Sequence, residues 1–147
     1  MYTSGEAVTR AFFNRWNVKD ADGMAHLFIE DADFVNVVGL WWRNRKAIRK
    51  AHSYGFERIF QYAKIDITEL RVRKLRDDIH IVHTVSTLEG QTAPDGRIGG
   101  LRVAVISLVT EKRDGEFKIV SVQNTDRVEG ADTHLALDTR FGPASYR

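Results

Sequence analysis

Two histidines three residues apart, His80 and His83, are the side chains of this chain best suited to proton or metal chemistry. They lie in the segment IHIVHTVSTLEG, whose β-branched residues predict a strand. Side chains three residues apart on a strand point to opposite faces, so the pair cannot chelate one metal ion. The chain also has no cysteine. We therefore expect no metal site.

His83 is the candidate for acid–base catalysis. It shares one face of the predicted strand with Ile79, Ile81 and Val85, so we expect it to point toward the interior. An imidazole has an ordinary pKa near 6.5, which suits it to carry a proton at neutral pH. The alternative is a hydrogen-bonded core histidine, which is the more frequent role of a lone histidine on an apolar face.

Three further polar residues interrupt predicted strands and can orient a ligand. Asn36 lies within an apolar strand, Arg102 opens another, and Asn124 lies near the end of the last one. The alternative for each is a structural cap or an exposed strand edge. The sequence has no G-x-G-x-x-G, P-loop, G-x-S-x-G or H-E-x-x-H motif, and we expect no cofactor.

The order of elements predicts an α+β fold. Helical spacing begins near Thr3 and Glu6, Asp20 can cap a short second helix, and Asn44 can cap a third. The acidic segment EDAD is expected to be a turn before the first strand, FVNVVG. From Ile65 the period becomes two, and a change of parity predicts a β-bulge near Thr68–Glu69. Three more strands follow, and Arg113-Asp114-Gly115-Glu116 is expected to form a tight turn between the last two.

We therefore expect three helices packed on one face of a strongly curved, mainly antiparallel sheet. Residues 1–127 would form one domain, and residues 128–147 a C-terminal tail or arm, because they show neither helical nor strand periodicity. The last strands are apolar on both faces, with Phe117 and Ile119 alternating with Val120 and Val122. Such a sheet needs cover on both faces, which predicts a homodimer.

The segment WWRNRKAIRK joins two tryptophans to a basic cluster. Trp41 and Trp42 are neighbours in an extended segment, so they point to opposite faces. The basic residues Arg43, Arg45, Lys46, Arg49 and Lys50 are expected to form the solvated face of the third helix. A formal net charge of only +2 argues against a nucleic-acid partner. The helix also lacks the outward apolar face that would bind a membrane surface.

Three stretches carry a resemblance to the nuclear transport factor 2-like superfamily, and within it to the SnoaL-like group labelled SgcJ/EcaC. They are LFIEDADFVNVVG, WRNRKAI and FKIVSVQNT, and the likeness spans about Glu6 to Arg127. Asn44 stands where the group usually has glycine, and Phe117 where it usually has tryptophan. The resemblance implies a cone, in which the curved sheet wraps around the helices and leaves a pocket at the open end.

In that cone we expect an apolar pocket with a few polar contacts. Trp16, Phe34 and Trp42 are its expected borders, Trp42 because it lies at the position of the group's motif. His83 and Asn124 are the expected polar contacts inside it, Asn124 by resemblance, and Asn36 and Arg102 are further lining candidates. The superfamily also suggests Asp33 as a base, by analogy with carboxylates in other members.

The expected function is small-molecule binding. The sequence and the resemblance together suggest a cofactor-free enzyme of the isomerase, cyclase or dehydratase type, acting by proton transfer on an apolar carbonyl or polyketide-like compound. The alternative is a non-catalytic ligand-binding or dimerisation module. A buried His83 beside an open cavity would favour the enzyme, and a filled cone the module. Without a signal peptide or a membrane-spanning segment, the expected location is cytoplasmic.

Overall fold

The computed structural model describes residues 1–147 and contains three helices on one side of a sheet. They are α1 (Gly5–Asn17), α2 (Ala21–Ala25) and α3 (Arg45–Arg58). Each begins at a polar side chain that accepts a backbone N–H of the first turn: Ser4 from Ala7, Asp20 from Gly23 and Asn44 from Ala47. The caps expected at Asp20 and Asn44 are confirmed, whereas α1 is capped by Ser4 and not by its neighbour Thr3.

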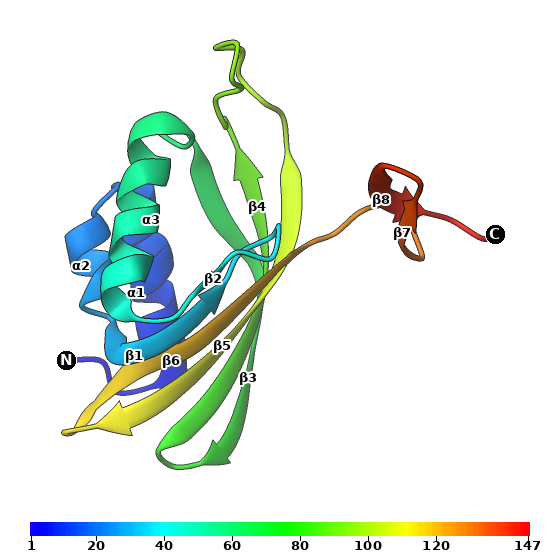
Figure 1. Cartoon of the computed structure of the whole chain (residues 1–147). Helices are drawn as coiled ribbons and strands as arrows, with labels where there is room; N and C mark the ends of the chain where they lie inside the picture. Colours follow the sequence, from blue (N-terminus) through cyan, green and yellow to red (C-terminus); the bar gives the residue numbers. More distant parts are fainter.

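The sheet has six strands in the order β2-β1-β6-β5-β4-β3. Their bounds are β1 (Phe28–Val35), β2 (Trp41–Trp42), β3 (Lys64–Arg76), β4 (Ile79–Glu89), β5 (Arg102–Arg113) and β6 (Glu116–Asp126). The pairing of β1 with β6 is parallel and the other pairs are antiparallel. The sheet is therefore mixed, and the chain has an α+β fold with a curved sheet (Figure 1).

Two local predictions about β-structure are confirmed and one is wrong. The register of β3 against β4 shifts between Ile67 and Glu69, where the parity change predicts a bulge. Asp114 and Gly115 both have positive φ, 51° and 81°, as a tight hairpin turn between β5 and β6 requires. The acidic segment EDAD is not a turn, because β1 already begins at Phe28. Its pairing with β6 is irregular between Phe28 and Asp33, which lets the two exposed carboxylates Glu30 and Asp31 stay in solvent.

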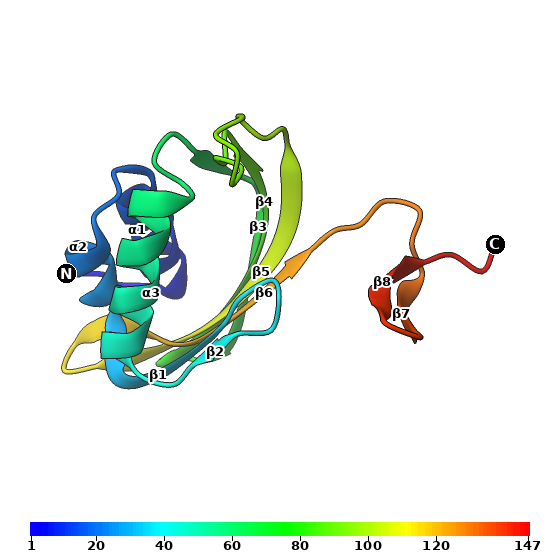
Figure 2. The same cartoon turned by 45° about the horizontal axis from the view of Figure 1, so that its top comes forward.

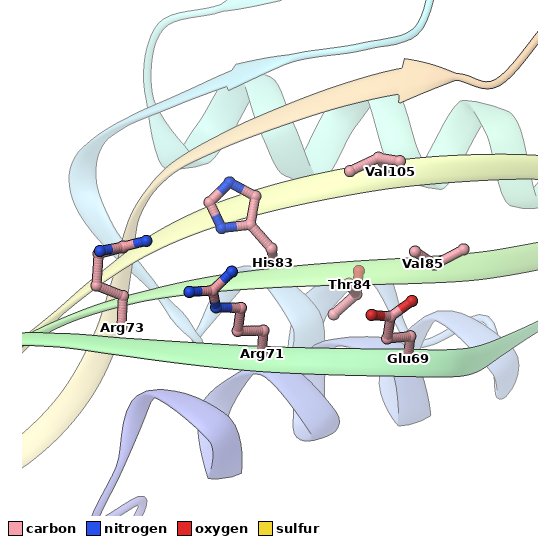
Figure 3. A pocket seen from close by; sticks show the side chains of 7 residues that line it. All are labelled: Glu69, Arg71, Arg73, His83, Thr84, Val85 and Val105. Atoms are coloured by element: carbon pink, nitrogen blue, oxygen red, sulfur yellow. The ribbon is translucent and has the colours of Figure 1, made fainter.

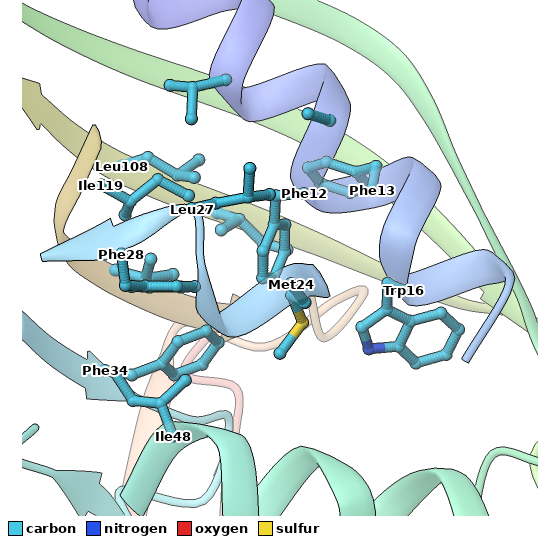
Figure 4. Packing of buried hydrophobic residues seen from close by; sticks show 14 of the residues in the cluster. Phe12, Phe13, Trp16, Met24, Leu27, Phe28, Phe34, Ile48, Leu108 and Ile119 are labelled. Atoms are coloured by element: carbon cyan, nitrogen blue, oxygen red, sulfur yellow. The ribbon is translucent and has the colours of Figure 1, made fainter. Parts of the chain in front are cut away.

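The hydrophobic core lies between the helices and the concave face of the sheet (Figures 1 and 2). A cluster of 21 buried residues joins the inward faces of α1 and α3 to β1, β4, β5 and β6. Figure 4 shows its centre, where Phe12 of α1 packs against Phe28 and Phe34 of β1 with ring centroids 6.0 and 6.2 Å apart. These side chains fill the space between the helices and the sheet.

The C-terminal residues 128–147 extend away from the main sheet and the helices. A second, two-stranded sheet, β7 (Thr133–Leu137) and β8 (Arg140–Ala144), stands apart on the side of the main sheet opposite the helices (Figures 1 and 2). The sequence predicts an arm or tail here but not the hairpin within it. No helix of the chain combines the length and the apolar character that crossing a membrane requires.

Candidate functional site

Strand register defines which side chains line the concave face. The inward row nearest the core runs across all six strands through Trp42, Phe34, Val122, Leu108, Val82 and Val72. The next row toward the open end contains Asn124, Ile106, Thr84 and Leu70. The row after that contains Asp126, Ala104 and Ser86. The concave face therefore changes from wholly apolar to mixed polar toward the open end.

His52 of α3 faces this surface within a group of aromatic rings. Its ring centroid lies 5.0 Å from that of Phe34, 5.4 Å from that of Trp42, 6.1 Å from that of Phe56 and 6.4 Å from that of Phe12. These rings come from α1, α3, β1 and β2, so four elements hold the imidazole in place. His52 is the one histidine that the structure places among the expected pocket borders.

The hydrogen bond of His52 sets its tautomer, and burial sets its protonation state. Its Nδ1 lies 2.8 Å from the carbonyl oxygen of Ile48, one turn earlier in α3. A carbonyl only accepts, so Nδ1 carries the proton and Nε2 keeps its lone pair in the neutral ring. Burial among apolar rings lowers the pKa of His52 to about 4, against a smaller opposing effect of the bond to Ile48. His52 is therefore a neutral hydrogen-bond acceptor at physiological pH.

Asn124 and Ser86 are polar groups on the same face that lack partners. The Oδ1 of Asn124 and the Oγ of Ser86 are buried and accept or donate no hydrogen bond within the chain. Asn124 follows Val122 by two residues on β6, and Val122 is paired with Phe34, the ring next to His52. Two residues along a strand span about 7 Å. An unpaired buried polar atom costs about 1–3 kcal/mol, which a ligand could recover.

An ion pair lies where β5 begins and β6 ends. The Nη2 and Nε of Arg102 donate to the carboxylate of Asp126 at 2.9 and 3.1 Å, and Nη1 donates to Oε1 of Gln91 at 2.8 Å. Arg102 and Asp126 are both half-buried, with about a third of each side chain exposed (31% and 32%). The donors of Arg102 are thus occupied by protein partners, and its role as a lining residue stays a prediction.

His83 does not point into the cone. Along β4 the buried residues are His80, Val82, Thr84 and Ser86, and His83 is exposed on the other face. The expectation that the face with more apolar residues points inward is wrong here. The inward face of β4 carries hydroxyl groups near the open end, whereas Ile81 and Val85 lie half-exposed on the outer face.

The remaining predicted residues divide between the two faces. Phe34 and Trp16 are buried, with 4% and 6% of their surface exposed, and Trp42 packs against the core. Trp41 is on the outer side, as the alternation predicts, and its Nε1 donates to Asp33 at 2.8 Å. Asp33 is therefore a partner of Trp41 and not a base inside the cone.

Asn36 has a structural role. Its Oδ1 accepts the backbone N–H groups of Val38 and Leu40, which closes the turn between β1 and β2. Asn36 therefore acts as a structural cap, the role that the sequence suggests as the alternative to ligand binding. The basic residues Arg45, Lys46, Arg49 and Lys50 lie on α3 and are largely exposed. Arg43 precedes the helix and stacks on the outward Trp41, with its guanidinium carbon 3.6 Å from the ring centroid.

The outer face of the sheet carries a shallow hollow of about 220 Å³ around His83 (Figure 3). The side chains around it come from β3, β4 and β5 and are Glu69, Arg71, Arg73, His83, Thr84, Val85 and Val105. Arg71 is paired in register with His83, and Val85 with Val105. The hollow is separated from His52 by the whole thickness of the sheet.

Sequence reasoning missed His52, although a signal for it exists. Ile48, His52 and Phe56 recur every four residues of α3, so they lie on one helical face. Ile48 and Phe56 are buried, which carries His52 inward between them. A histidine in the inward stripe of a helix was therefore a better candidate than one on a strand whose two faces are both apolar.

Comparison with known proteins identifies the fold family. The profile of the SnoaL-like domain matches residues 6–124, and the chain belongs to this family. The resemblance to the nuclear transport factor 2-like superfamily is thereby confirmed. The comparison with curated proteins finds no match.

Three solved structures show how widely this fold is shared. An uncharacterised protein with a cystatin-like fold from Caulobacter vibrioides superposes with a TM-score of 0.78 at 26% identity, covering 84% of this chain and 87% of that one. A putative scytalone dehydratase from Novosphingobium aromaticivorans gives 0.74 at 15% identity, covering 84% and 81%. A ketosteroid isomerase-like protein from Erwinia carotovora atroseptica gives 0.69 at 16% identity, covering 82% and 92%. The last two likenesses show the fold alone.

Proposed function

We propose that the chain binds a small, flat, mostly apolar molecule on the concave face of the sheet, with a hydroxyl or carbonyl group directed at His52 and Asn124. The observation that carries the proposal is a neutral imidazole inside a group of four aromatic rings, with its Nε2 lone pair free of the bond that holds Nδ1. Ligand sites in proteins are typically apolar with a few such polar groups.

Two features support this assignment of the polar groups. The buried Oδ1 of Asn124 lacks a partner in the chain, and the same is true of the Oγ of Ser86. A ligand hydroxyl donates to an acceptor such as Nε2 of His52 or Oδ1 of Asn124, and a hydroxyl such as that of Ser86 can donate to a ligand carbonyl. The names of the structural neighbours, a putative scytalone dehydratase and a ketosteroid isomerase-like protein, are consistent with small-molecule chemistry on this fold.

A second candidate function, proton transfer without a cofactor, is favoured by the tautomer of His52. An apolar or polyketide-like carbonyl compound bound here presents the acidic C–H next to its carbonyl to Nε2. Nε2 takes that proton, the electron pair of the C–H bond forms a carbon–carbon double bond, and the π pair of the carbonyl moves to its oxygen. A donor such as the amide of Asn124 then stabilises the negative charge on that oxygen. A pKa of about 4 makes His52 a weak base, so binding alone is the simpler function.

The binding proposal is tested by calorimetry with 2-naphthol and 2-methoxynaphthalene, which share a ring system but differ in having a hydroxyl donor. We expect 2-naphthol to bind at least 10-fold more tightly to the unmodified chain, because the methyl ether cannot donate to Nε2. The variant His52→Phe keeps an aromatic ring and should abolish this preference. His83→Phe, on the other face, is the matched control and should preserve it.

If neither compound binds, or if His83→Phe removes the preference and His52→Phe does not, the site is wrong. The proton-transfer function is tested separately by the exchange of the α-hydrogens of 2-tetralone in D₂O, followed by NMR. Exchange that is faster with the unmodified chain than with His52→Phe supports catalysis. Equal rates with both proteins leave a ligand-binding module.

A further inference from the structure

The C-terminal arm, residues 128–147, has no contact that explains its conformation within the chain. The last hydrogen bond that ties this end of the chain to the sheet runs from the N–H of Arg127 to the carbonyl of Val103. Beyond it, the hydrogen bonds of the hairpin join arm residues to one another, such as Asp132 N–H to Ala144 and Tyr146 N–H to Asp132. Its strands β7 and β8 pack on each other, and neither is in extensive contact with any other element.

The hairpin exposes large apolar side chains. Leu135 and Leu137 of β7 are 42% and 63% exposed, Phe141 of β8 is 73% exposed, and Tyr146 beyond it is 72% exposed. A lone two-stranded hairpin is at best marginally stable in water. The hairpin therefore needs a surface that covers it whenever the protein is folded.

We propose that the arm docks on the outer sheet face of a second copy of this chain. The arm lies on the side of the sheet opposite the helices (Figures 1 and 2), which is the side a second copy must approach to reach the outer face. That face carries a group of half-exposed apolar side chains along β4 and β5, namely Ile81, Val85, Val103, Val105 and Val109. Each copy therefore exposes apolar side chains both on its arm and on its outer sheet face, and the arm of one copy can bury those on the face of the other.

A second copy is favoured over an unrelated protein by two arguments. A partner that covers the exposed hairpin must be available whenever the chain is made. A second copy of the chain is the one partner that is always made together with it. Exchange of an identical element between two copies is also a low-cost route to a symmetric dimer, because each contact is formed twice. Docking of the arm would be the contact that holds together the homodimer expected from the sequence.

The hollow around His83 matches the tip of the arm in chemical character. It combines two arginines, Arg71 and Arg73, with one carboxylate, Glu69, beside the apolar Val85 and Val105 (Figure 3). The tip of the arm offers the complementary pair, the apolar Leu137 followed by the carboxylate of Asp138. Asp138 has a φ of 54°, which turns the chain tightly and places both groups at the end of the hairpin. The arm would thus bring a leucine to the valines and a carboxylate to the arginines.

Cross-linking tests the proposal directly, because the chain has no cysteine of its own. One preparation carries Leu137→Cys and a tag that changes its mass, and the other carries Val105→Cys. After mixing and treatment with a short bismaleimide, we expect a species that contains one tagged and one untagged chain. Leu137→Cys mixed with Val18→Cys, an exposed position of the helical layer, is the control that should not form it.

The double variant Leu137→Cys/Val105→Cys separates docking on a partner from folding back. Cross-links between chains support the proposal, whereas a product cross-linked only within single chains shows that the arm covers its own sheet and overturns it. Absence of any arm-to-sheet product overturns it as well, and leaves the arm to a different partner.

Light scattering supplies a second measure that does not depend on cysteines. The unmodified chain should have twice the monomer mass of 16.8 kDa at micromolar concentration. Leu137→Glu should weaken dimerisation at least 10-fold, and Asp138→Asn, which keeps a residue tolerant of positive φ, about 3-fold. Val18→Glu and Glu129→Gln are the matched controls. A chain that is monomeric throughout, or controls that weaken the dimer equally, would rule the proposal out.

Discussion

The two faces of β4 differ in a way that the hydrophobic pattern alone does not reveal. The face toward the helices is buried but carries His80, Thr84 and Ser86, and the face toward solvent carries Ile79, Ile81 and Val85. The inner face of β4 is thus the more buried one, although the outer face carries more of the strand's isoleucine and valine side chains. This distribution is consistent with the two proposals, a ligand group on the inner face and a docked arm on the outer face.

The two histidines show the consequence for chemistry. His52 lies among aromatic rings, and burial lowers its pKa to about 4, so it remains neutral in the cone. His83 is exposed beside two arginines on the outer face, where it is accessible to a second protein molecule. A histidine's neighbours in space, and not the apolar residues that flank it in sequence, decide which kind of site it serves.

The largest difference between the faces should appear in stability. Phe34→Ala removes a ring that is 4% exposed and contacts Phe12, Phe28, Trp42 and His52, so it should lower the free energy of unfolding by about 3–5 kcal/mol. Trp41→Ala removes a larger ring that is 51% exposed, and should cost about 1 kcal/mol. Urea denaturation of both variants measures the contrast, and equal losses would contradict the assignment of the two faces.

Much of the fold could be predicted from the sequence because local signals specify it. Asp20 and Asn44 cap their helices, the parity change at Thr68–Glu69 produces a bulge, and Asp114-Gly115 forms a turn. Each of these depends on a few adjacent residues. The start of β1 was misplaced because Glu30 and Asp31 look like a turn, whereas pairing with the distant β6 makes them part of a strand.

The site was harder to predict because it depends on contacts between distant segments. Trp42, Phe34 and Trp16 were identified correctly as inward residues from alternation, helical spacing and resemblance. His52 was missed, since its environment is built by α1, β1 and β2, and His83 was misassigned because both faces of β4 are apolar enough to be buried. The hairpin of the arm was missed because its strands are only five residues each.

The acid stability of the fold should depend on the inner histidines. Because the pKa of His52 falls to about 4 on folding, the unfolded chain binds more protons than the folded chain between about pH 4 and 6.5. The stabilisation is complete above pH 6.5 and is lost as the pH falls through this window, by at most about 3 kcal/mol. His52→Phe should remove most of this slope in urea titrations at several pH values.

His80 should account for part of the slope that remains in that variant. Burial, and next the charge of Lys74, lower its pKa, and its Nδ1 accepts the backbone N–H of Gly5 at the start of α1. A slope that persists in full in His52→Phe would show that the ring is not held neutral by its surroundings.

Removing the unpaired polar group from the inner face should have a smaller and opposite effect. Asn124→Leu replaces a buried amide whose Oδ1 has no partner, and should raise the free energy of unfolding by about 1 kcal/mol. The same variant should lose binding of 2-naphthol, because the polar group proposed to contact the ligand is gone. A loss of stability instead would show that Asn124 supports the fold and not a ligand. Thermal unfolding with and without 2-naphthol gives both results.

The smallest effects should come from the basic cluster of α3, on the surface outside both faces. Lys46 lies in the first turn of α3, where the helix dipole disfavours a cation, so Lys46→Glu should stabilise the fold by about 0.3–1 kcal/mol. Arg49→Glu should cost a similar amount, since the exposed pair of Arg49 with Asp22 at 3.1 Å is lost.

The triple variant Arg45→Glu/Lys46→Glu/Arg49→Glu should therefore unfold close to the midpoint of the unmodified chain. Neither protein should bind a 20-mer oligonucleotide at physiological ionic strength, as measured by fluorescence anisotropy. Tight binding by the unmodified chain, with a steep dependence on salt that the triple variant lacks, would show that this cluster is a nucleic-acid site. In that case the functional surface of the molecule would be the outside of α3, and the contrast between the two sheet faces would concern only folding and assembly.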